Sequence, residues 1–328
     1  MRPEPALTSN TPQGRTPTRA NPLTGSLVAL ALLVLFNALT TPGFFSAQTL
    51  NVNLTQVATI VIVACGMTLV IATGGIDLSV GSLMAISGAI APMIFMTLSL
   101  SGLEVALGFV VPVLVAGMFG LFNGYLVSQQ RIQPIIATLV LFIAGRGIAQ
   151  VITNGNLQTF SNGAFQYIGL GRPLGLPFQV LLMIAVVALT AWLVRATTFG
   201  RYILAVGGNE RAAELAGVPV ARVKLLVYAL SGMLAGVAGL IVIAINSSSD
   251  ANQVGLNMEL DAIAAVAVGG TALSGGNARI VGTLLGALLI QLIRYTLLVK
   301  GVPDAVALVV KAAIIVAAVY LQNQRGQA

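Results

Sequence analysis

The sequence contains no histidine and only one cysteine, Cys65. These absences exclude histidine metal sites, histidine proton relays and an internal disulfide. Because Cys65 lies inside a long apolar run, we interpret it as a packing residue. Charged residues are also scarce: they make up 8% of the chain, against 57% hydrophobic residues. This balance argues strongly against an ordinary soluble domain.

Motifs of enzyme active sites are missing as well. No lysine follows a glycine anywhere, so the phosphate-binding motif GxxxxGK[ST] is absent. There is no G-x-S-x-G sequence and no pair of cysteines that would bind a metal ion. We therefore expect a protein that is not an enzyme, with no cofactor and no metal.

Long apolar runs dominate what remains. A bilayer's hydrocarbon core is about 30 Å thick, so a crossing helix needs about 20 mostly apolar residues. The sequence therefore predicts an all-α, polytopic membrane protein with about ten transmembrane helices, of which the eighth is short and would be re-entrant or broken. The expected spans are 25–42, 54–73, 81–100, 104–129, 133–153, 176–195, 222–246, 258–271, 280–299 and 304–322.

The positive charge of the chain gives it an orientation in the membrane. The 16 Lys and Arg residues outnumber the 9 Asp and Glu residues, and most lie in short loops and tails. This distribution indicates membrane topology and not nucleic-acid binding. With the N-terminus in the cytoplasm, only Arg172 and Lys300 fall clearly outside. Both termini are then cytoplasmic, which requires an even number of spans.

Three parts follow along the chain. Residues 1–23 are rich in Pro, Thr and Arg with no hydrophobic period, which predicts a disordered cytoplasmic tail. Residues 24–322 form the transmembrane domain, and 323–328 a short cytoplasmic C-terminal tail.

One cytoplasmic loop contains a short helix, predicted at 209–217. Asn209 is a suitable N-terminal cap, Glu210 favours the first turn, Ala213 is a good helix former, and Gly217 is a typical C-terminal stop. The segment is too polar to enter the bilayer. It is either an ordinary amphipathic connector or a docking element for a cytoplasmic partner.

Paired glycines interrupt two of the apolar runs. Residues 72–81 and 267–276 both read A-x-G-G-x-x-L-S-x-G, which predicts helix breaks at Gly74, Gly75, Gly269 and Gly270. Interrupted helices in both halves of a transporter often lie near its pathway. With 36 glycines in the chain, chance similarity is the alternative explanation.

Four polar residues lie in or beside otherwise apolar spans. We predict that Asp77, Ser79, Asn123 and Thr138 lie near a translocation path. The alternatives are structural: the region of Asp77 and Ser79 would cap the following helix, while Asn123 and Thr138 would join helices by hydrogen bonds. Arg146, if buried, needs an acidic or carbonyl partner.

Four sequence blocks stand out along the chain: GMTLVIATGGIDLSVGSLMAISGAI (66–90), QPIIATLVLFIAGRGIAQ (133–150), AVGGNERAAELAGV (205–218) and ELDAIAAVAVGGTALSGG (259–276). These blocks resemble the permease subunits of bacterial ABC importers for ribose, xylose, arabinose and related sugars. The likeness is greatest to galactofuranose importer permeases, particularly at 145–150 and 250–259. The resemblance extends over nearly all of 25–322, and the blocks occur in the same order.

The resemblance implies a type II ABC importer-like permease in the bacterial inner membrane, which moves a monosaccharide such as a pentose or galactofuranose. It also implies the partners: a second permease (identical or homologous), a cytoplasmic ABC ATPase that grips the 209–217 helix, and a periplasmic sugar-binding protein. Membrane lipid surrounds the chain, and no nucleic acid is expected. The alternatives are an ion-gradient-driven secondary transporter or channel, and a branched-chain amino-acid or cobalamin-type permease.

Overall fold

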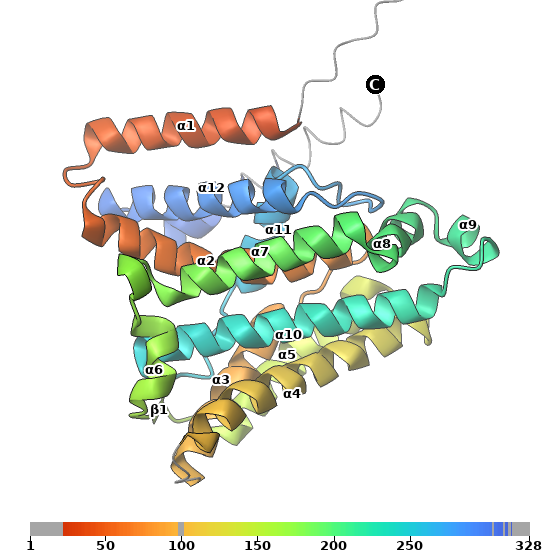
Figure 1. Cartoon of the computed structure of the whole chain (residues 1–328), viewed down its shortest axis with the longest axis horizontal. Helices are drawn as coiled ribbons and strands as arrows, with labels where there is room; N and C mark the ends of the chain where they lie inside the picture. The colour runs from red at the N-terminus through yellow and green to blue at the C-terminus, as the bar shows by residue number, and fades with distance from the viewer. Residues whose placement is uncertain (1–21, 98–101, 304, 311, 314–315, 317–328) are drawn as a thin grey trace, which may run out of the picture.

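The computed structural model describes residues 22–97, 102–303, 305–310, 312–313 and 316, and these residues are mostly helical. Long helices lie side by side, and short elements gather at both ends of the bundle (Figure 1). The helices are α1 (Pro22–Thr40), α2 (Ala47–Ala72), α3 (Val80–Thr97), α4 (Leu103–Ser128), α5 (Pro134–Ile152), α6 (Gly163–Leu170), α7 (Phe178–Ala196), α8 (Thr198–Gly208), α9 (Glu210–Leu215), α10 (Val220–Asn246), α11 (Met258–Val268) and α12 (Ile280–Val299).

Among the described residues, seven helices are long and apolar enough to cross a membrane: α2, α3, α4, α5, α7, α10 and α12. Helix α1 has a shorter apolar stretch, Thr24–Thr40. Helix α11 has only 11 residues, in keeping with the expected short eighth span. The tenth expected span and the two tails, 1–23 and 323–328, lie largely outside the described residues, so the count of ten and the orientation stay predictions.

Helix α2 forms the centre of the bundle. Every residue from Val57 to Ala72 is buried, so this helix is apolar on all sides, as expected for a helix enclosed by others. Its neighbours include α7, α10, α11 and α12. Helices α4 and α10 pack tightly against each other, and Gly120 lies against the backbone of Tyr228 and leaves no room for a side chain.

Two opposite ends of the bundle carry different structures (Figure 1). At one end, α8 and α9 extend beyond the long helices. At the other lie α6 and a two-stranded antiparallel sheet, β1 (Gln158–Thr159) with β2 (Ser248–Ser249). Helix α10 runs from α9 to β2, and its 27 residues span about 40 Å at 1.5 Å per residue.

Two helices were not expected from the sequence. Between the expected spans 176–195 and 222–246 the sequence predicts a single helix, at 209–217, but α8 also occupies Thr198–Gly208. It is amphipathic and buries Gly200, Ile203 and Val206. Helix α6 is also short and begins at the cap Asn162. Both escape a search for runs of about 20 apolar residues because they pack against the bundle without crossing it.

Candidate functional site

The break between α2 and α3 is a turn built on glycine. Helix α2 ends at the cap Thr73, and Gly74 follows with a φ of +83°, which is unfavourable for other residues. The hydroxyl of Thr73 donates a hydrogen bond of 2.7 Å to the carbonyl oxygen of Val70. Gly75 lies directly against the buried hydroxyl of Tyr228 on α10. The chain thus leaves α2 in a fixed direction.

The four residues predicted for the translocation path lie together around this break. All four are fully buried. The Asp77 carboxylate accepts hydrogen bonds from the Ser79 amide (3.0 Å) and hydroxyl (2.6 Å), and from the hydroxyl of Ser231 on α10 (2.8 Å). Asp77 therefore caps the segment that leads into α3 and ties it to α10.

Helices α4 and α5 hold the same segment from other sides. Asn123 on α4 donates from Nδ2 to the Ser79 hydroxyl at 2.8 Å. Thr138 on α5 accepts from the backbone N–H of Leu78 at 3.1 Å. The oxygen Oδ1 of Asn123 is buried and has no hydrogen-bond partner among the described residues. The four residues form one hydrogen-bonded cluster, and whether they line a path stays a prediction.

The second glycine pair also ends a helix. Helix α11 stops at Gly269, and Gly270 follows with a φ of +81°. When the two A-x-G-G-x-x-L-S-x-G motifs are aligned, Gly269 corresponds to Gly74. In the structure, however, Gly270 is the residue that has the positive φ of Gly74. The offset arises because α11 continues one residue further into the shared motif than α2 does.

The two breaks contact each other and α8. The amide of Gly276 donates to the carbonyl oxygen of Ala72 at 3.0 Å, which joins the segment after α11 to the end of α2. Gly207 of α8 lies against both of these backbone groups, so a side chain at position 207 would collide with them. Helix α8 is therefore in direct backbone contact with both interruptions.

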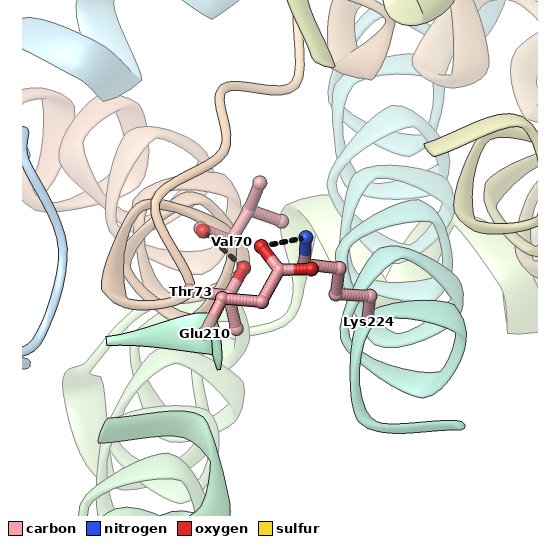
Figure 2. Close-up of polar contacts among 4 residues, drawn as sticks. All are labelled: Val70, Thr73, Glu210 and Lys224. Carbon is pink, nitrogen blue, oxygen red and sulfur yellow. Dashed lines mark hydrogen bonds and ion pairs between the residues drawn. The ribbon is translucent and has the colours of Figure 1, made fainter. Parts of the chain in front are cut away.

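Helix α9 follows α8 and is held to α10 by an ion pair. Figure 2 shows the carboxylate of Glu210 directed at the ammonium group of Lys224, close to Thr73 at the end of α2. The two charged atoms are 2.7 Å apart, and the Lys224 side chain is largely buried. A cavity of about 280 Å³ lies here, lined by residues that include Gly74, Lys224 and Tyr228.

The residues predicted for coupling give α9 its shape. Asn209 caps it by accepting from the Ala212 amide at 2.9 Å, Ala213 is buried, and Gly217 ends it with a φ of +81°. The helix is shorter than expected, with six residues. Coupling by Asn209, Glu210, Ala213 and Gly217 stays a prediction.

The exposed side chains of α9 were not predicted from the sequence as contact residues. Arg211 and Glu214 are exposed, and Leu215 is 79% exposed. An apolar leucine on a short polar helix was the available signal, because exposed apolar residues at a polar surface often mark a protein interface.

A larger cavity, of about 910 Å³, lies at the opposite end of the bundle. It is lined by the N-terminal half of α2, the C-terminal end of α10, the beginning of α11 and the second half of α12. Many lining side chains are amides and hydroxyls. The sequence did not indicate this cavity, because only the fold brings together the four elements that line it.

Arg146 of α5 holds the loop that borders this cavity. Its Nη1 donates to the carbonyl oxygens of Ala251 (2.8 Å) and Val254 (2.6 Å), so it has the carbonyl partners that its burial requires. Among the described residues, no cluster of three or more Asp, Glu, His or Cys side chains would hold a metal ion.

Comparison with known proteins identifies the family of this chain. The family described as "Branched-chain amino acid transport system / permease component" matches residues 49–319, which include both helix breaks and α9. The chain belongs to this permease family. No solved structure matches it.

Curated relatives of the permease are named for sugars. It is 44% identical to the ribose import permease protein of Escherichia coli strain K12, over 92% of this chain and 93% of the relative. It is 41% identical to the galactofuranose transporter permease protein of the same strain, over 91% and 89%. The L-arabinose ABC transporter permease protein of Azospirillum brasilense is 35% identical, over 91% and 88%. The resemblance to sugar importer permeases is thereby confirmed, with a higher identity to this ribose permease (44%) than to the galactofuranose permease (41%).

Proposed function

We propose that this chain is the membrane-spanning permease subunit of an ATP-driven ABC importer that moves a monosaccharide from the periplasm to the cytoplasm. The substrate is a pentose or a galactofuranose-like sugar, and the chain itself hydrolyses nothing. It resides in the bacterial inner membrane as a multi-pass protein. The names of relatives at 35% to 44% identity, aligned over about nine tenths of the chain, support this function.

The observation that carries the proposal is the position of α9. This helix stands beyond the long apolar helices and exposes Arg211, Glu214 and Leu215, which a separate protein can contact. The segment behind it, α8, touches both helix breaks through Gly207. A force applied to α9 by an ATP-hydrolysing partner therefore reaches the places where α2 and α11 are interrupted.

The partners in this proposal are those that the resemblance to ABC importers implies. A cytoplasmic ABC ATPase docks on α9, held in shape by Asn209, Glu210, Ala213 and Gly217. A second permease, identical or homologous, completes the membrane part, and a periplasmic sugar-binding protein delivers the substrate at the other end. Ten spans with both termini in the cytoplasm place α9 on the cytoplasmic side.

The breaks act as hinges in a two-state transition between outward-open and inward-open forms. Asp77, Ser79, Asn123 and Thr138 lie near the path in at least one of these states. Their hydrogen bonds support this role because they concentrate polar contacts where α2 is interrupted. In the glycine pairs 74–75 and 269–270, the positive φ of Gly74 and Gly270 supports the hinges because it lets the chain turn sharply at both interruptions.

Reconstitution tests the proposal. Proteoliposomes that contain the permease, its ATPase and its sugar-binding protein should accumulate radiolabelled D-ribose, L-arabinose or D-galactofuranose only with ATP. The permease alone should neither bind ATP nor import sugar. Uptake by the permease alone under an ion gradient would support the alternative, a secondary transporter or channel.

A second substrate class follows from the description of the family, which refers to branched-chain amino acids. ATP-driven accumulation of L-leucine, with no accumulation of any of the three sugars, would favour that class over monosaccharides.

A further inference from the structure

We propose that the 910 Å³ cavity at the end opposite α9 is a monosaccharide-binding site within a single permease subunit. This inference rests on the proposed function and adds to it the location and the chemistry of sugar recognition. The volume lies in the range of about 300–1,000 Å³ that small-molecule sites occupy.

Helix α2 contributes a stripe of polar side chains to the cavity. Gln48, Asn51, Thr55 and Thr59 are spaced three or four residues apart, which places them on one face of the helix, and all four line the cavity. The stripe extends to Thr59, just inside the buried part of α2 that begins at Val57. On a helix that contacts only lipid or apolar neighbours, such a row of polar side chains would be energetically unfavourable.

Two buried atoms in the lining lack a hydrogen-bond partner among the described residues. They are Oγ1 of Thr55, whose residue is 8% exposed, and Oε1 of Gln291 on α12, whose residue is 2% exposed. Buried polar atoms are nearly always paired in folded proteins. Both residues belong to the cavity lining, so their unpaired oxygens lie beside the space that a bound molecule would fill.

The surrounding amides point to a molecule with several hydroxyl groups. Gln291 donates from Nε2 to Oε1 of Gln56 at 2.6 Å, so the Gln291 amide is oriented before any ligand arrives. Asn257 begins α11 but does not cap it with its side chain, although asparagine is a favoured cap. Its side chain lines the cavity instead.

Hydroxyl groups donate and accept hydrogen bonds, as these amides do, so a sugar matches the lining better than an ion does. Charged side chains are outnumbered in the lining by amides and hydroxyls. The apolar residues among them, such as Val242 and Met258, would contact the C–H faces of a sugar ring.

Variants of the lining test the site in the reconstituted importer. Gln291→Leu and Thr55→Val should each lower ATP-driven sugar uptake roughly fivefold to tenfold, as expected for the loss of one or two hydrogen bonds. Gln179→Leu is the matched control: Gln179 is fully buried and its Oε1 has no hydrogen-bond partner in the described part of the chain, but it lies on α7 outside the cavity lining. Its uptake should stay near wild type.

A labelling experiment does not depend on transport. Thr55→Cys, in a Cys65→Ala background, should react with a water-soluble maleimide in the assembled complex. Saturating D-ribose, L-arabinose or D-galactofuranose, whichever the importer accepts, should slow this reaction severalfold. Slowing by L-leucine and by none of the sugars would overturn the assignment to a monosaccharide.

The outcomes separate the inference from the function on which it rests. If the wild-type importer accumulates none of the sugars, the proposed function fails. The binding site alone is refuted under a different outcome. In that case the wild-type importer accumulates a sugar, the Gln291 and Thr55 variants take it up as fast as Gln179→Leu does, and the sugar does not slow maleimide labelling of Thr55→Cys.

Discussion

Single residues decide how closely the backbones approach where α8 meets the two helix breaks. Gly207 and Gly208 are neighbours on α8, yet their surroundings differ. A side chain at Gly207 would collide with backbone of Ala72 and Gly276, whereas no described residue has an atom within 4 Å of the position a side chain would take at Gly208. This pair separates the effect of packing from the effect of helix propensity.

We expect Gly207→Ala to destabilise the permease by about 1–3 kcal/mol, the usual cost of inserting atoms into a well-packed core. Gly208→Ala should change stability by less than about 1 kcal/mol, because alanine favours a helix over glycine. Thermal unfolding of the purified permease measures both. Equal stability of the two variants would show that the backbone around Gly207 can shift to accommodate a methyl group at little cost.

Asp77 is the second residue with a clear local role. It accepts hydrogen bonds from Ser79 and Ser231, so Asp77→Ala leaves buried donors unpaired. Hydrogen bonds to a charged group contribute about 1.5–3 kcal/mol, and we expect a loss of that order in the free energy of unfolding. Asp77→Asn, which keeps an accepting oxygen, should lose less; a larger loss for Asn than for Ala would contradict this account.

At the scale of elements, α9 combines an anchored side with an exposed one. Glu210 and Ala213 face the permease, so substitutions there disturb the shape of the helix and do not test docking alone. Arg211, Glu214 and Leu215 face outward. Docking is therefore best tested on the outer side.

Leu215→Asp should reduce co-purification of the ATPase at least tenfold, because a charge would replace an apolar contact at the interface. The permease should keep its thermal stability, since Leu215 is 79% exposed. Leu174→Asp is the control: this leucine is 97% exposed and lies in the loop between α6 and α7, away from α9. Full retention of the ATPase by the Leu215 variant would place the contact elsewhere.

At the scale of the whole molecule, the proposed orientation puts α9 and the 910 Å³ cavity on opposite sides of the membrane. Leu215→Cys should then react with a membrane-impermeant maleimide only in inside-out vesicles, and Leu174→Cys only in intact spheroplasts. The native Cys65 is fully buried and should add little background. Reaction of both variants from the same side would refute the topology.

The sequence predicted the large elements of the fold well. Long apolar runs located α2, α10 and α12, and the glycine pairs located two helix ends, because both signals are local in the chain. Helix α8 was missed because 11 amphipathic residues give no membrane-length run. The 910 Å³ cavity was missed because only the fold brings Thr55 and Gln291 together, although they are 236 positions apart.

The continuity of α10 has a mechanical consequence. This unbroken helix pairs with Glu210 through Lys224 near its start and borders the 910 Å³ cavity with Asn246 at its end. A rod about 40 Å long that tilts by about 5° moves its far end by roughly 3.5 Å. Under the proposed function, a motion driven by ATP hydrolysis on one side of the bilayer would thus widen or narrow the cavity on the other side through this single helix. In return, a sugar bound in the cavity would change the position of α9 and so affect the ATPase.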